Sequence, residues 1–73
     1  MASQLKLLDV IALLEDLPQQ RLQRGQVGTI VEVLAPGIYE VEFSDDAGRT
    51  YAMAALRADQ LMSLRYEPVG TGD

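Results

Sequence analysis

The chain has 73 residues, of which 48% are hydrophobic, and it contains no cysteine, histidine or tryptophan. This composition excludes disulfides, thiolate metal sites and catalytic triads that use an imidazole base. Eleven acidic and six singly scattered basic residues give a formal net charge of −5, which disfavours binding to phosphate backbones and favours a basic protein partner.

The first apolar segment, "LKLLDVIALLEDL", is compatible with two kinds of secondary structure. Leu5, Leu8 and Ile11 follow helical spacing, whereas Val10 and Ala12 alternate as in a strand. The segment is too short and too charged to span a bilayer or to form a signal-peptide core. We therefore expect a cytoplasmic protein. The following "LPQQRLQRGQ" is rich in polar residues with a proline and a glycine, and predicts a loop.

The segment "GQVGTIVEVL" alternates regularly and predicts a strand. The alternation assigns its residues to an inner face and an outer face: Val27, Thr29, Val31 and Val33 inside, and Gly28, Ile30, Glu32 and Leu34 outside. Gly28 lacks a side chain where a strand normally carries one, which is typical of a tight bend or of another backbone passing close by.

The stretch "VEVLAPGIYEVEF" predicts a hairpin whose register depends on the length of its loop. A two-residue loop would place apolar residues opposite polar ones, so we favour a three-residue loop. The expected cross-strand pairs are Val33 with Tyr39, Val31 with Val41, Thr29 with Phe43, Glu32 with Glu40, and Ile30 with Glu42. An acidic pair on the outer face is the by-product of placing the aromatic residues inside.

The second half of the chain predicts a further hairpin and a last short strand. Adjacent aspartates and Gly48 in "SDDAGRT" indicate a turn. The alanine-rich "TYAMAAL" is a weaker strand, held by its context or by small side chains that permit close packing. "RADQL" predicts one helical turn that Asp59 can cap, and "LMSLRY" predicts the last strand.

These elements define an all-β fold, a small five-stranded SH3-like barrel with one short 3-10 turn before the last strand. We expect three parts of the chain: an N-terminal extension over residues 1–6, the barrel domain over residues 7–67, and a flexible C-terminal tail over residues 68–73.

The segments "LEDLP", "GQVGTIVEV" and "YEVEF", followed by "DQL", resemble a family of small bacterial proteins, the domain of unknown function 4926. The likeness covers roughly residues 7–68. It implies an SH3-like barrel whose first strand spans residues 9–16, which would decide between strand and helix there. The family brings no established activity, so it assigns no catalytic residue.

Surface charge and exposed apolar residues suggest a place for a partner. We predict a partner-binding outer face formed by Ile30, Glu32, Leu34, Ile38, Glu40 and Glu42. Ile11 and Leu13 are further apolar residues that the core does not obviously need, which is typical of an interface. Tyr51 and Tyr66 are the aromatic residues best suited to a partly exposed surface.

We expect no catalytic residue, metal or cofactor. A barrel this small fills its own interior, and the adjacent acids of the turn lack the ligand spacing of a calcium loop. The sequence favours a non-catalytic protein-protein interaction module, such as an acidic antitoxin-like or accessory partner of a basic protein. The alternatives are a KOW-like RNA-associated module and a structural homo-oligomer.

Overall fold

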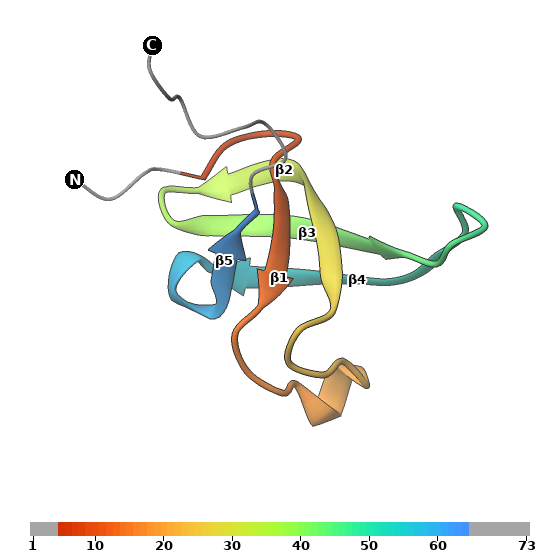
Figure 1. Ribbon diagram of the computed structural model, residues 1–73. Coiled ribbons are helices and arrows are strands. Elements are labelled where there is room, and N and C mark those ends of the chain that lie inside the picture. The colour runs from red at the N-terminus through yellow and green to blue at the C-terminus, as the bar shows by residue number, and fades with distance from the viewer. Residues whose placement is uncertain (1–4, 65–73) are drawn as a thin grey trace, which may run out of the picture.

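The computed structural model describes residues 5–64, which form one antiparallel sheet (Figure 1). The elements in chain order are β1 (Val10–Leu13), η1 (Pro18–Gln20), β2 (Val27–Ala35), β3 (Ile38–Ser44), β4 (Thr50–Arg57), η2 (Ala58–Gln60) and β5 (Leu61–Ser63). The strand order in the sheet is β4-β3-β2-β1-β5. The first strand therefore lies between the second and the last.

Five strands and a 3-10 turn directly before the last strand confirm the predicted all-β fold. The first apolar segment is a strand, β1, which is shorter than the range 9–16 that the family resemblance implied. The expected loop after it contains a second 3-10 turn, η1. The sheet is strongly bent but not closed, because β4 and β5 end it without pairing with each other in the described residues. It resembles a barrel only loosely.

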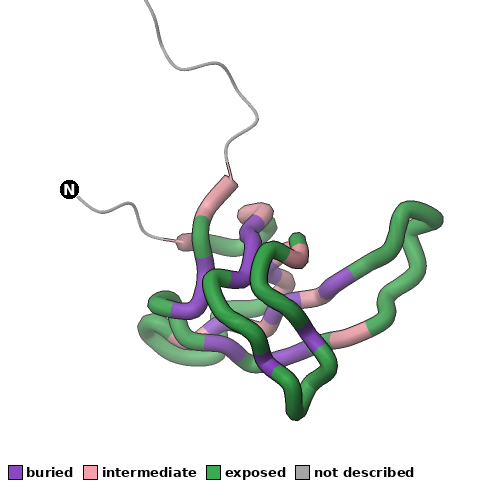
Figure 2. Tube along the Cα trace, turned by 60° about the horizontal axis from the view of Figure 1, so that its bottom comes forward, coloured by how far each residue is buried: buried purple, intermediate pink, exposed green. Residues whose placement is uncertain are grey.

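The core lies on the concave side of the bent sheet. Alternate residues of β3 are buried, and they pack with apolar residues of β1, β2, β4 and the first loop (Figure 2). The largest fully buried side chains are Phe43, Ile11, Leu13, Leu22, Ile30, Leu56 and Val41. Ala52 and Ala54 of β4 stand opposite Phe43 and Val41. Small residues on β4 thus leave room for the larger side chains of β3.

Gly28 lies where two strands approach closely, as its place in the sequence predicted. A Cβ atom there would lie 2.7 Å from Cγ1 of Val41 and 2.9 Å from both Cδ2 of Phe43 and the backbone oxygen of Glu42. No side chain fits at these distances, so glycine allows the β3 side chains to fold over β2 and the sheet to bend.

The register of the β2–β3 hairpin differs from the predicted one in its second half. Val33 pairs with Tyr39 and Glu32 with Glu40, as expected. A register shift lies between Ile30 and Glu32. Beyond it, farther from the hairpin loop, each residue of β2 pairs one position away from the expected partner on β3, so that Ile30 faces Val41 instead of Glu42. The inner and outer faces of β2 are therefore exchanged before Val31.

The hairpin loop also differs from the prediction. Ala35 pairs with Ile38, so the loop contains only Pro36 and Gly37, and a second register shift between Val33 and Ala35 takes up the extra residue. Gly37 has a φ of 78°, which glycine adopts without strain. A two-residue loop with a bulge thus gives the same Val33–Tyr39 pair as a three-residue loop.

The predicted turn between β3 and β4 is present and projects from the body of the molecule (Figure 1). Oδ1 of Asp45 accepts hydrogen bonds of 2.9 Å from the backbone N–H groups of Ala47 and Arg49. Aspartate is favoured in turns because its side chain satisfies backbone donors in this way. Tyr66, the expected tail over residues 68–73 and most of the expected extension over residues 1–6 lie outside the described residues.

Candidate functional site

The outward side of β2, β3 and β4 carries the acidic residues that the sequence singled out. Residues that stand opposite each other on antiparallel strands share a face, and Glu40 pairs with both Glu32 on β2 and Ala55 on β4. Glu42 pairs with Met53, and Ile38 pairs with Arg57. The acidic face, defined as Glu32, Ile38, Glu40, Glu42, Met53 and Ala55, therefore extends over three neighbouring strands.

The carboxylates of the acidic face have no cationic partner among the described residues. The two ion pairs in this part of the chain join Arg49 to Asp45 at 3.8 Å and Arg57 to Asp59 at 3.0 Å. Oε2 of Glu42 accepts a hydrogen bond of 2.5 Å from Oγ1 of Thr50. Glu32 and Glu40 face each other across the hairpin, and in residues 5–64 neither is neutralised by a cation.

Most of the predicted partner-binding residues are accessible, but Ile30 is not. Glu32 and Leu34 are exposed, and Ile38, Glu40 and Glu42 are half-buried. Ile30 is 0% exposed and belongs to the core, so its predicted contact with a partner is wrong. The register shift in β2 is the cause, because it turns Ile30 toward Val41. Ile11 and Leu13, also predicted at an interface, are buried in the same core.

Two residues of the acidic face were missed by sequence reasoning. Met53 is 51% exposed, and Ala55 is exposed beside Glu40. The alternation of "TYAMAAL" carries the signal, since Ala54 and Leu56 are buried while Met53 and Ala55, which alternate with them, are exposed. Tyr51 is half-exposed, as expected, and its hydroxyl accepts a hydrogen bond of 3.2 Å from Nε2 of Gln26.

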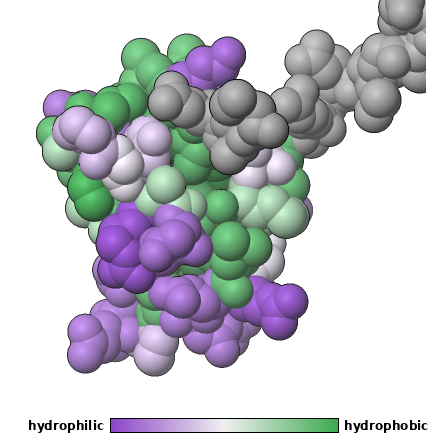
Figure 3. Space-filling model, turned by 90° about the vertical axis from the view of Figure 1, so that its left-hand side faces the viewer, coloured by the Kyte–Doolittle hydropathy of each residue, from purple (hydrophilic) through white to green (hydrophobic). Residues whose placement is uncertain are grey.

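The end of the β2–β3 hairpin adds exposed apolar side chains, of which Val33 pairs with Tyr39 and therefore lies on the face opposite Glu32 and Glu40. Leu34 and Val33 are both about half exposed. From the side of the molecule where this hairpin ends, hydrophobic surface gathers in the upper part and hydrophilic surface in the lower part (Figure 3).

A second apolar surface crosses the other end of the sheet. Ala12 of β1 pairs with Val27 of β2 on one side and with Met62 of β5 on the other, so the three side chains share a face. Val27 and Met62 are both exposed by more than 40%. This apolar row (Val27, Ala12 and Met62) presents the exposed Val27 and Met62 on either side of the buried Ala12, and these two side chains are suited to contact with another apolar surface.

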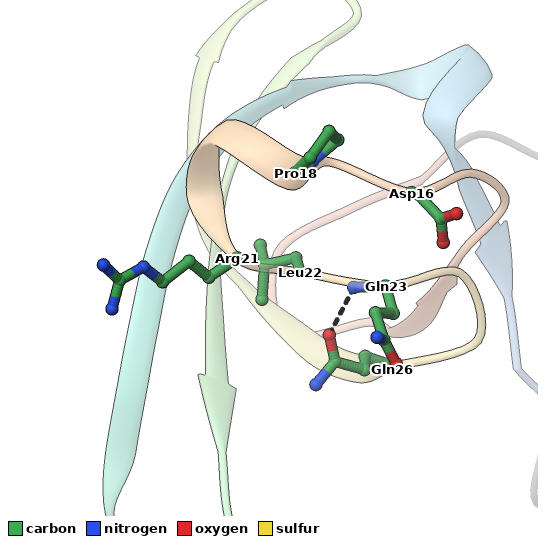
Figure 4. A pocket seen from close by; sticks show the side chains of 6 residues that line it. All are labelled: Asp16, Pro18, Arg21, Leu22, Gln23 and Gln26. Atoms are coloured by element: carbon green, nitrogen blue, oxygen red, sulfur yellow. Dashed lines mark hydrogen bonds between the residues drawn. The ribbon is translucent and has the colours of Figure 1, made fainter.

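A pocket of about 360 Å³ lies beside η1, between the two halves of the first loop (Figure 4). Its walls come from Asp16, Pro18, Arg21, Leu22, Gln23 and Gln26. The backbone N–H of Arg24 donates a 2.8 Å hydrogen bond to Oδ1 of Asp16, and the Arg21 side chain points away from the other labelled residues. Asp16 is the single carboxylate among the residues that line this pocket.

Within residues 5–64, no three histidine, cysteine, aspartate or glutamate side chains are grouped so as to hold a metal ion. Those residues also include no helix that is long and apolar enough to cross a membrane. The acidic face is consequently the most distinctive chemical feature of the described chain.

By its fold and this surface, the protein is a small antiparallel β-domain with an acidic outer face. Residues 7–63, which are 57 of the 73 residues, match the domain of unknown function 4926, and the chain belongs to that family. Neither the curated proteins nor the solved structures provided a significant match.

Proposed function

We propose that this protein is a small non-catalytic interaction module of the cytoplasm that binds a basic protein through its acidic face. An acidic antitoxin-like or accessory protein, which neutralises or supports a basic partner, is one form of this function. The net charge of −5 attracts a basic protein at long range, and the acidic face supplies the local charges.

The observation that carries the proposal is the direct pairing of Glu32 with Glu40. Like charges opposite each other on a sheet destabilise it, and in the described residues neither glutamate forms an ion pair with a lysine or arginine. A cation brought by a partner would relieve this repulsion at the moment of binding. The pairing thus costs stability in the free protein and is relieved in a complex.

Apolar side chains beside the glutamates support a protein partner over a small ion. Met53, Ile38 and Leu34 offer accessible hydrocarbon next to the charges. Protein interfaces combine apolar contacts at their centre with charged groups at their rim, and methionine adapts to irregular surfaces. A basic protein can satisfy both parts of this surface at once.

Affinity capture with charge-matched variants tests the proposal. The tagged native chain, the double variant Glu32→Lys/Glu40→Lys and the control Asp46→Lys/Asp59→Lys are each incubated with host lysate. Each substitution changes the charge by two, so both variants carry −5 + 4 = −1. Asp46 and Asp59 are exposed residues outside the acidic face.

We expect a basic protein to bind the native chain and the control but not the variant of the acidic face. The captured protein is then purified and titrated against all three chains, to show that the contact is direct. Equal binding to both double variants would refute the acidic face as the site, because its charges would then contribute no more than charges elsewhere on the surface. Capture of nucleic acid in place of a protein would support the KOW-like alternative.

A structural homo-oligomer is the second candidate, and the apolar row supports it. Burial of the exposed Val27 and Met62 side chains against a second copy would remove apolar area from water. Self-association makes the melting temperature rise with protein concentration. A melting temperature that stays constant over a hundredfold range of concentration would refute this candidate.

A further inference from the structure

The two edges of the sheet differ in how well they are protected against strand addition. β5 spans only Leu61–Ser63, and very short edge strands offer little to pair with. β4 spans the eight residues Thr50–Arg57 and pairs only with β3 in the described part of the chain. Its other side therefore carries backbone N–H and C=O groups that pair with no strand of the described residues.

The free edge of β4 lacks the features that usually prevent pairing. It contains neither proline nor lysine, and its single charged residue, Arg57, is the last one. A register shift near Thr50 disturbs only its first part, so that Ala52–Arg57 is regular. Eight strand residues extend for about 26 Å, which is enough for a partner strand of ordinary length.

The acidic face lies directly beside this edge. Glu40 and Glu42 stand on β3, one strand inward from the edge, opposite Ala55 and Met53. A strand added to β4 would lie two strand spacings, about 10 Å, from β3. Because Ala55 has a short side chain, a lysine or arginine on the added strand can extend across it toward Glu40. Met53 can pack against the hydrocarbon stem of a second such residue.

We propose that the partner binds by strand addition: an extended segment of a basic protein pairs with the free edge of β4. Its outward side chains opposite Ala55 and Met53 are cationic, and its alternate side chains are apolar and continue the inner row of Ala54 and Leu56. The residue opposite Arg57 is neutral or acidic, since that guanidinium shares the outward face with Ile38. Backbone pairing of this kind supplies affinity, and alternate side chains supply specificity.

This inference rests on the proposed function and adds its binding mode. A second copy of the chain is less suited to the edge, because it would bring a further net charge of −5 beside the glutamates. A basic segment matches both the backbone edge and the charges next to it. The free edge of β4 and the neighbouring glutamates therefore both favour an extended basic segment.

The test uses a synthetic peptide of eight residues in which lysine alternates with valine, except that the position opposite Arg57 is glutamine in place of lysine. The control peptide has the same sequence, with methyl groups on the backbone nitrogens of its four central residues. Methylation keeps the charge but removes the N–H donors that a strand needs on both of its sides. Both peptides are titrated into the ¹⁵N-labelled native chain at low salt, and amide shifts are followed by NMR.

We expect the unmethylated peptide to shift the amides of Ala52–Arg57, and the methylated peptide to bind at least about tenfold more weakly, since several backbone hydrogen bonds are lost. Replacement of Ala55 by isoleucine should also weaken binding of the unmethylated peptide, whereas Ala55→Ser keeps the path to Glu40 open and should not. Isoleucine favours strands, so this variant retains the fold.

Equal binding of the two peptides, or shifts that leave the amides of β4 unchanged, would overturn strand addition. If both peptides bind the native chain equally and both are lost in Glu32→Lys/Glu40→Lys, charge recognition by the acidic face stands and only the binding mode fails. A failure of the unmethylated peptide to bind overturns the inference as well, while capture from lysate decides the proposed function separately.

Discussion

Gly28 shows how a single residue shapes this small fold. Its Cα lies so close to β3 that a Cβ would come within 3 Å of Val41, Glu42 and Phe43. The absence of a side chain therefore lets the sheet curve around its core. The alternation of "GQVGTIVEVL" indicated a special role for this glycine, but the atoms it approaches belong to another strand and could not be read from it.

Replacement of Gly28 by alanine should lower the free energy of unfolding. Overpacking of this kind typically costs about 1–3 kcal/mol, because β3 or its side chains must move. The loss is measured by urea unfolding against Ser44→Ala, an exposed strand position that tolerates a small side chain. A Gly28→Ala variant as stable as the native chain would contradict the close approach of β2 and β3.

Ile30 is the residue for which the sequence pattern was most misleading. In a strand of uniform register, Ile30 shares a face with Glu32 and points outward. The register shift at Val31 breaks this relation, and buries Ile30 while Val33 is 48% exposed. Alternation cannot reveal a bulge, because a bulge depends on how the neighbouring strand pairs.

The variants Ile30→Ala and Val33→Ala distinguish the observed register from the uniform one. Truncation of the buried Ile30 should cost about 2–5 kcal/mol of stability. Truncation of the exposed Val33 should change stability by about 0.5 kcal/mol or less. Thermal or urea unfolding of both variants provides the comparison, and a larger loss for Val33→Ala would show that the uniform register is correct.

At the scale of elements, the predictions from sequence succeeded where periodicity and turn residues agree. β2, β3 and the turn at Asp45 follow directly from alternation and from the acidic residues before Gly48. β1 was ambiguous because its apolar residues fit both a helix and a strand, and the resemblance to a family decided it. The unclosed sheet was not predicted, because closure depends on contacts between β4 and β5 that no local pattern encodes.

Glu40 is expected to lower the stability of the β2–β3 hairpin and to raise the affinity for a basic partner. Replacement by glutamine keeps the shape of the side chain and removes the repulsion from Glu32. Stability should rise by a few tenths of a kcal/mol up to about 1 kcal/mol, and the affinity for a basic partner should fall. Unfolding in urea and titration with the captured protein measure the two effects. A variant that loses stability would show that the acidic pair is not strained.

At the scale of the whole molecule, charge and shape point to the same surface. The acidic excess was evident from composition, and the glutamates of the outer face were located from the hairpin alone. Met53, Ala55 and the free edge of β4 complete the surface, and they required the pairing of β3 with β4. A chain of this size has a small core, so its outer strands are available for contact with another protein.

The measurement that tests the central claim most directly is an NMR titration of the ¹⁵N-labelled chain with the purified basic partner. The account predicts that the largest amide shifts occur at Glu32, Glu40 and Ala55, on the acidic face. Shifts concentrated at the pocket beside η1, or along the row of Val27, Ala12 and Met62, would contradict it and place the binding site elsewhere.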